Sequence, residues 1–108
     1  MNWISITTEQ EVEGIKNSGE LALIYKHSTR CMVSLMALKK LKSESTGDYS
    51  VPFYMVDVIK DRSVSRTIAD AFSVEHESPQ LLLVKDGACV YDASHESVSL
   101  KPILHFFE

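Results

Sequence analysis

The chain has 108 residues, which fits one domain and leaves no room for a second, so we expect a single domain over residues 1–108. Apolar residues make up 44% and charged residues 24%, which excludes a disordered chain. The formal net charge of −4, with scattered lysines and arginines, argues against nucleic-acid binding. No apolar run can span a membrane and no secretory signal is visible, so we expect a cytoplasmic protein.

The first half of the chain alternates apolar runs with helical patterns. Residues 3–6 are a short strand candidate. Residues 7–11, with their capping hydroxyls and acidic side chains, start a helix, and Gly19 ends it. Residues 21–25 are almost continuously apolar, which predicts a central strand buried on both faces. Residues 31–41 predict a helix with apolar residues all round, so it should be covered on more than one side.

Three more strands and two helices are predicted in the second half. The strands are expected over residues 51–58, 80–84 and 88–91. The helices are expected over residues 61–72 and 98–107. The turn at Asp86-Gly87 joins the last two strands into an antiparallel hairpin. This order predicts an α/β fold with a central mixed β-sheet flanked by helices on both faces.

Two cysteines are too few for a disulfide scaffold, and their spacing fits no zinc pattern. Cys31 stands where the buried strand has ended and a helix begins. Free backbone N–H groups and the helix dipole favour a thiolate there, and Arg30 and His27 could add positive charge. We therefore predict an acidic thiol that reacts in thiol–disulfide exchange. The alternative is an inert, packed cysteine.

Ser34 lies three residues after Cys31, where a second cysteine would allow an internal disulfide. A serine cannot close that bond, although its hydroxyl can donate a hydrogen bond to the thiolate. A mixed disulfide on Cys31 must then wait for an external thiol. The alternative is that Ser34 is an ordinary helix-start residue.

The remaining candidates carry weaker signals. The Ser78-Pro79 pair precedes an apolar strand, and residue statistics favour a trans bond there. His27 reads as a surface histidine, and Cys89 reads as a packed strand cysteine. His76 and His95 have no paired ligands at useful spacing, so we expect no metal site.

The block His-Ser-Thr-x-Cys-x-x-Ser at residues 27–34, with Met-Ala-Leu at 36–38, Ser-Pro-Gln at 78–80 and Ala-Ser-His at 93–95, resembles the monothiol bacilliredoxins, the YtxJ-like proteins of the bacillithiol system. The resemblance covers nearly the whole chain in the same order. The chain departs from the family pattern at Met32, where proline is frequent, and at Glu96, where an aromatic residue is frequent.

The resemblance implies a thioredoxin-like fold with a cis peptide at Ser78-Pro79, in a loop that faces the reactive cysteine. It also implies removal of bacillithiol from modified protein cysteines, with no bound cofactor and with bacillithiol as co-substrate. The expected partners are bacillithiolated proteins and a second thiol or a reductase for regeneration, and the expected state is a monomer. The catalytic residues would be Cys31 and Ser34, and the substrate-binding residues would be Thr29, Arg30, Met32, Val33, Ser78 and Pro79.

Two other functions remain open. One is a binding module without turnover, in which loops around Pro79 dock a partner and Cys31 is incidental. The other is a redox sensor that pairs Cys31 with Cys89. We expect the helix start and a strand near the sheet edge to lie too far apart for a disulfide, which argues against this sensor.

Overall fold

The architecture comes from a computed structural model, which describes residues 3–45, 47 and 49–107. The elements are, in chain order, β1 (Trp3–Ser5), α1 (Glu9–Ser18), β2 (Ala22–His27), α2 (Met32–Glu44), β3 (Phe53–Asp57), α3 (Arg62–Phe72), β4 (Gln80–Lys85), β5 (Ala88–Ser94) and the 3-10 helices η1 (His95–Ser97) and η2 (Lys101–Phe107). The strands form one sheet in the order β1-β3-β2-β4-β5. β1, β3 and β2 are parallel to one another, whereas β4 is antiparallel to both of its neighbours, β2 and β5. This arrangement confirms the predicted mixed sheet.

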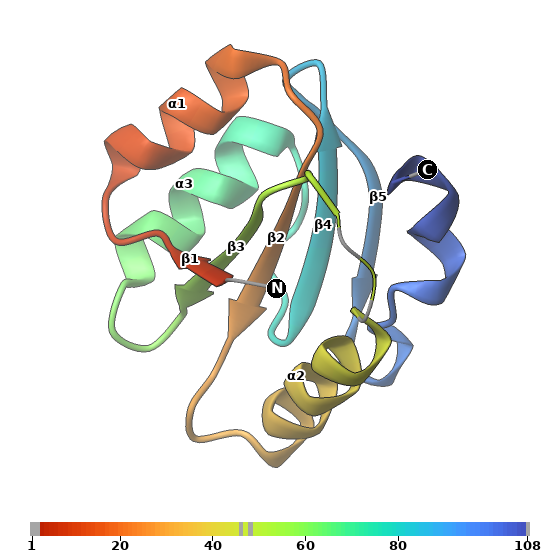
Figure 1. Cartoon of the computed structure of the whole chain (residues 1–108). Helices are drawn as coiled ribbons and strands as arrows, with labels where there is room; N and C mark the ends of the chain where they lie inside the picture. Colours follow the sequence, from red (N-terminus) through yellow and green to blue (C-terminus); the bar gives the residue numbers. More distant parts are fainter. Residues whose placement is uncertain (1–2, 46, 48, 108) are drawn as a thin grey trace.

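Helices cover both faces of the sheet, as predicted (Figure 1). α1 and α3 pack on one face, over a core that includes Val12, Ile24 and Ile68. α2 and η2 cover the other face, over a core that includes Tyr25, Leu41 and Ile103. Within the described ranges, no helix is long and apolar enough to cross a membrane.

The middle strand β2 is buried along its whole length. It pairs with β3 on one side and β4 on the other, so that Tyr25 lies between Met55 and Leu81. Because side chains alternate along a strand, Tyr25 faces α2 whereas Lys26 faces α1 and α3. The predicted central strand is confirmed, and it extends past Tyr25 through Lys26 and His27.

The ends of α1 follow directly from local chemistry. Thr8 is the N-cap, and its hydroxyl accepts a hydrogen bond from the backbone N–H of Glu11, whose carboxylate accepts one from the backbone N–H of Thr8. Gly19 closes the helix in the left-handed conformation at φ 68°, which costs a glycine little. Both predicted ends are therefore confirmed.

The predicted helix over residues 98–107 is wrong in its type and in its start. The structure has one 3-10 helix there, η2, which starts only at Lys101, and the non-helical residues 98–100 separate it from η1. Pro102 has no backbone N–H and its ring would clash with a preceding α-helical turn, so a helix cannot continue back to residue 98. The segment before it is held by Glu44, whose carboxylate accepts bonds from the Ser99 hydroxyl at 2.8 Å and the Leu100 backbone N–H at 2.9 Å.

Candidate functional site around Cys31

Cys31 is the N-cap of α2, in the loop that leads from the carboxyl end of β2 (Figure 1). Its backbone is extended, with φ −114° and ψ 121°, and its carbonyl accepts the first helical bond from the backbone N–H of Leu35 at 3.1 Å. The backbone N–H of Cys31 donates to the carbonyl of Ser28 at 3.3 Å, which closes the turn before the helix. The thiol is half-buried and belongs to a free cysteine.

The first turn of α2 lowers the pKa of the Cys31 thiol below its ordinary value. The main cause is the backbone N–H of Ser34, and the backbone N–H of Val33 and the Ser34 side chain act in the same direction, against a smaller effect of desolvation. These are the unpaired donors at a helix N-terminus that stabilise a thiolate. Neither Arg30 nor His27 is among the causes, so the positive charge considered from the sequence plays no part in the shift.

Ser34 is fully buried beneath the first turn of α2. Its hydroxyl has no hydrogen-bond partner among the N and O atoms of the described chain, which leaves it free to donate to a thiolate. Its carbonyl accepts a hydrogen bond of 2.7 Å from the hydroxyl of Tyr25, which rises from β2. Burial raises the pKa of Tyr25 well above its ordinary value, so the hydroxyl stays a donor. Sequence reasoning missed Tyr25, although it is the one hydroxyl in an otherwise apolar run.

The peptide bond between Ser78 and Pro79 is cis, as the family resemblance implies and against the residue statistics. Pro79 is buried, and its carbonyl accepts a bond of 2.9 Å from the backbone N–H of His95. The Ser78 hydroxyl is buried without a hydrogen-bond partner in the described chain. This loop and the loop that carries Cys31 lie at the same end of the sheet (Figure 1).

The site thus combines a strand-end cysteine that caps a helix, a serine three residues on and a cis-proline before β4. The family model of the monothiol bacilliredoxin BrxC matches residues 4–103. The chain belongs to this family. It is therefore a thioredoxin-fold protein of thiol redox chemistry, as the sequence resemblance predicted.

Solved structures confirm the fold of this bacilliredoxin family member. A candidate oxidoreductase with a thioredoxin fold is 23% identical with a TM-score of 0.84, over 98% of this chain and 94% of that chain. Thioredoxin from Malassezia sympodialis is 15% identical with a TM-score of 0.78, over 98% and 90% of the two chains. Thioredoxin from Schistosoma mansoni is 19% identical with a TM-score of 0.75, over 100% of both. Identities this low show the fold alone.

Among the residues that flank the thiol, the interpretation of His27 as a surface residue is wrong. Its side chain is only 6% exposed, because β2 continues through it and pairs it with Asp57 of β3. Burial lowers the pKa of His27, with the carboxylate of Asp57 as a smaller opposing influence, so the imidazole is mostly neutral at pH 7. Thr29 and Arg30, by contrast, are exposed beside Cys31.

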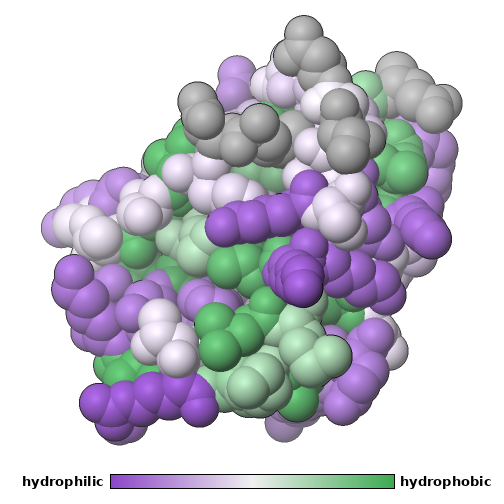
Figure 2. Space-filling view, turned by 60° about the horizontal axis from the view of Figure 1, so that its bottom comes forward, coloured by the Kyte–Doolittle hydropathy of each residue, from purple (hydrophilic) through white to green (hydrophobic). Residues whose placement is uncertain are grey.

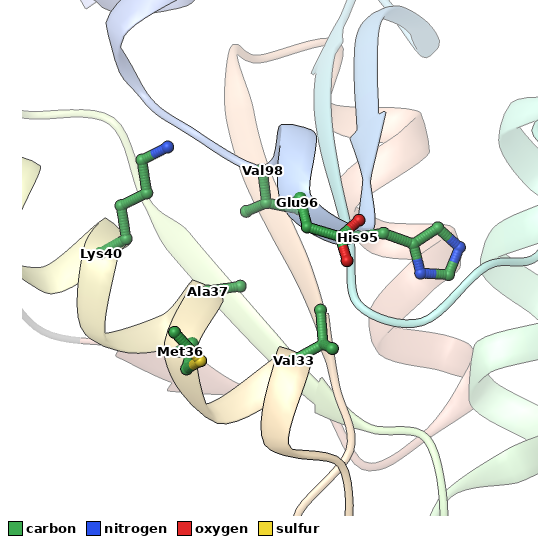
Figure 3. A pocket seen from close by; sticks show the side chains of 7 residues that line it. All are labelled: Val33, Met36, Ala37, Lys40, His95, Glu96 and Val98. Atoms are coloured by element: carbon green, nitrogen blue, oxygen red, sulfur yellow. The ribbon is translucent and has the colours of Figure 1, made fainter.

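An apolar groove lies between α2, the helix that Cys31 caps, and η1 (Figure 3). Its volume is about 340 Å³, and its lining residues are Val33, Met36, Ala37, Lys40, His95, Glu96 and Val98. Of the predicted binding residues, only Val33 lines it. The wall formed by His95, Glu96 and Val98 was missed because it is distant in sequence from α2.

Exposed apolar side chains surround the amino end of α2. Met32 is 68% exposed and Met36 is 65% exposed, and Leu35 is also exposed. Figure 2, which brings this end of the molecule forward, shows an apolar area bordered by polar residues. Flexible methionines suit a surface that binds several partners.

Proposed function

We propose that this protein removes bacillithiol from mixed disulfides on protein cysteines, with Cys31 as the nucleophile and Ser34 in place of a resolving cysteine. The observation that carries the proposal is the placement of Cys31 at the N-cap of α2, where the first turn lowers the pKa of its thiol. A thiol of this kind is ionised to a larger fraction at neutral pH than a free cysteine.

The exchange proceeds in two steps that balance in sulfur and electrons. The Cys31 thiolate attacks the bacillithiol sulfur, the bond between bacillithiol and the modified protein breaks, and the protein cysteine leaves as a thiolate that takes a proton from water. Cys31 now carries bacillithiol in a disulfide bond. A second small thiol then attacks the bacillithiol sulfur and leaves with it as a mixed disulfide, or a reductase supplies two electrons and bacillithiol leaves as a thiol; both routes restore the Cys31 thiolate.

The neighbouring residues are proposed to serve this exchange without a bound cofactor. The free Ser34 hydroxyl would donate to the thiolate before attack and after regeneration. Thr29, Arg30, Met32 and Val33 would contact the modified protein around the thiol. The partners are bacillithiolated proteins of the cytoplasm and a regenerating thiol or reductase, and the protein works as a monomer.

Ser78 and Pro79 complete the proposed substrate-binding set. They lie in the loop that shares one end of the sheet with Cys31 (Figure 1). In this proposal the backbone of that loop contacts the disulfide to be reduced, and the apolar groove takes the side chains of the modified protein.

Intact-mass analysis tests the proposal directly. The protein is incubated with a bacillithiolated model protein, and Cys31→Ala and Cys89→Ala are run as matched variants. We expect the substrate to lose its modification and the adduct to appear on wild type and on Cys89→Ala, but not on Cys31→Ala. Absence of transfer, with Cys31 unmodified, would contradict the proposal. Substrates modified with glutathione or coenzyme A, run in parallel, show whether another small thiol is preferred.

A further inference from the structure

Lys26 is a buried charged residue on β2, the middle strand of the sheet. Its side chain is 0% exposed and lies on the α1 and α3 face of β2. Within the described residues its ammonium group has no carboxylate within ion-pair distance, and its bond of 3.0 Å goes to Nδ1 of His76. Burial lowers the pKa of Lys26 to about 8, so the group is still mostly protonated at pH 7. An uncompensated buried ammonium is costly, and a nearby anion would offset that cost.

His76 and Ser65 connect Lys26 to the surface. The Ser65 hydroxyl lies 3.1 Å from the same Nδ1 atom of His76. Because an ammonium can only donate, His76 accepts at Nδ1 and keeps its proton on Nε2. Both His76 and Ser65 line a hollow of about 330 Å³ at the start of α3. Lys26 therefore sits directly behind the wall of this hollow.

Two arginines complete the hollow on the solvent side. Its other lining residues are Val58, Ile59, Arg62 and Arg66, so no acidic side chain lines it. In the described parts of the chain neither arginine forms an ion pair. Guanidinium groups hold carboxylates and phosphates through paired hydrogen bonds. The molecule as a whole is acidic, with a net charge of −4, which makes this cationic hollow a local exception.

None of three acidic residues near the hollow in the sequence, Asp57, Asp61 and Glu77, lines it. Asp57 accepts bonds at Oδ1 from the backbone N–H groups of Ile59 and Lys60. Asp57 and Asp61 both line a different hollow, together with His27. Glu77 lies 3.1 Å from Nε2 of His95. The cationic hollow is thus open to an external anion.

We propose that the hollow formed by Arg62, Arg66, Ser65 and His76, backed by Lys26, binds a small carboxylate or phosphate anion. Arg62 and Arg66 would donate to the anion, and Lys26 would supply the buried counter-charge behind His76. The site lies at the carboxyl end of β3, which runs parallel to β2, so it shares one end of the sheet with the Cys31 loop (Figure 1). Two sources could supply such an anion: a carboxylate of a thiol that reacts at Cys31, or a free anion such as phosphate.

NMR titration with inorganic phosphate and with malonate, at constant ionic strength, tests the site without any thiol chemistry. In wild type we expect saturable shifts of the amides of residues 62–66 and of the His76 imidazole. Arg62→Gln combined with Arg66→Gln should weaken binding by about tenfold or more. Lys85→Gln, which removes a distant exposed charge from β4, should bind as wild type does. Lys26→Met should also weaken binding, with the exposed arginines intact.

Two results would overturn the anion site: no saturation in wild type, or an equal loss of binding in Lys85→Gln. Neither result affects the proposed function, because no bacillithiol is used. Conversely, failure of bacillithiol transfer leaves the phosphate titration unchanged.

A matched pair of thiols identifies the source of the anion. A mixed disulfide on Cys31, formed with a general disulfide reagent, is reduced by thioglycolate or by uncharged 2-mercaptoethanol. If the anion belongs to the thiol, the double arginine variant slows thioglycolate by severalfold relative to 2-mercaptoethanol. If the ratio is unchanged while phosphate binding is lost, the site holds a free anion.

Discussion

The two cysteines of this chain lie in regions that treat a thiol in opposite ways. Cys31 caps α2, where backbone N–H groups lower the pKa of its thiol. Cys89 lies in β5 against the core under α1 and α3, and there burial raises the pKa of the thiol, with the carboxylate of Asp92 acting in the same direction. Its sulfur donates to the Tyr91 carbonyl at 3.2 Å. Backbone N–H groups at a helix N-terminus and burial in the core, rather than neighbouring lysines or arginines, thus shift the pKa values of the two thiols in opposite directions.

The largest effect should come from removing each thiol in turn. Cys31→Ala eliminates the nucleophile, so we expect the rate of exchange with a mixed-disulfide substrate to fall by at least about a hundredfold. Cys89→Ala should exchange at nearly the wild-type rate. Initial rates of substrate release measure both. Equal losses in the two variants would break the comparison.

Ser34→Cys should change the fate of the adduct on Cys31. A thiol at this position, in the first turn of α2, can attack the mixed disulfide and release the small thiol. We expect the adduct to persist in wild type and to be replaced by an internal disulfide in the variant, as read by intact mass. An adduct equally persistent in both proteins would show that residue 34 does not reach the sulfur.

Native-state labelling should separate the two cysteines directly. We expect iodoacetamide to modify Cys31 at least about tenfold faster than Cys89 at pH 7, and unfolding in guanidinium to remove most of this difference. Peptide mapping gives the rate at each site. Slow labelling of Cys31 in the folded protein would favour a binding module in which the cysteine is incidental.

The same experiment after mild oxidation tests the redox-sensor alternative. A crosslink between Cys31 and Cys89 in the peptide map would support it. We expect none, because Cys31 starts α2, which covers one face of the sheet, whereas Cys89 packs against the core on the other face.

Ser34→Ala should have a smaller effect, confined to Cys31. Loss of a hydroxyl that stabilises the thiolate raises the pKa of Cys31, so we expect labelling at pH 7 to slow by about two- to fivefold. Cys89 should be unaffected, and the difference should vanish at a pH where both proteins are fully ionised. A variant that labels Cys31 as fast as wild type at pH 7 would restrict the role of Ser34 to helix packing.

Tyr25→Phe should change the ratio of the two labelling rates least. The variant removes the donor to the Ser34 carbonyl, which leaves a buried acceptor and should lower the free energy of unfolding by about 1–3 kcal/mol. Because the remaining N–H groups of the first turn are intact, we expect Cys31 labelling to change by less than about twofold. Urea denaturation and labelling on the same sample measure the two effects separately.

Most of the fold was predictable because its signals are local. The capping residues around Thr8 and the apolar run of β2 act within a few residues of themselves, and both predictions are confirmed. The burial of Lys26 and His27 was not predictable, since it depends on pairing of β2 with β3 and β4. The segment after residue 98 was missed for a similar reason, because Glu44 holds it from another element.

In the candidate site, too, the residues with local sequence signals were predicted and those placed by tertiary contacts were not. Cys31 and Ser34 follow from a strand-to-helix junction and a spacing of three, both visible in the sequence. The groove is built from α2 and η1, and of its lining residues only Val33 was predicted to bind substrate. Tyr25 reaches Ser34 across the interface between sheet and helix, which no local pattern encodes.

The pH dependence of Cys31 alkylation in the Cys89→Ala protein tests the central claim most directly. Because the pKa of the Cys31 thiol is lowered, the rate should reach half of its maximum at a pH below about 8.5, the pKa of a free cysteine. The rate should then level off at higher pH. Unfolding should move the midpoint up to that of a free cysteine. A folded-state midpoint at or above 8.5 would contradict the account, since the first turn of α2 would then not stabilise the thiolate.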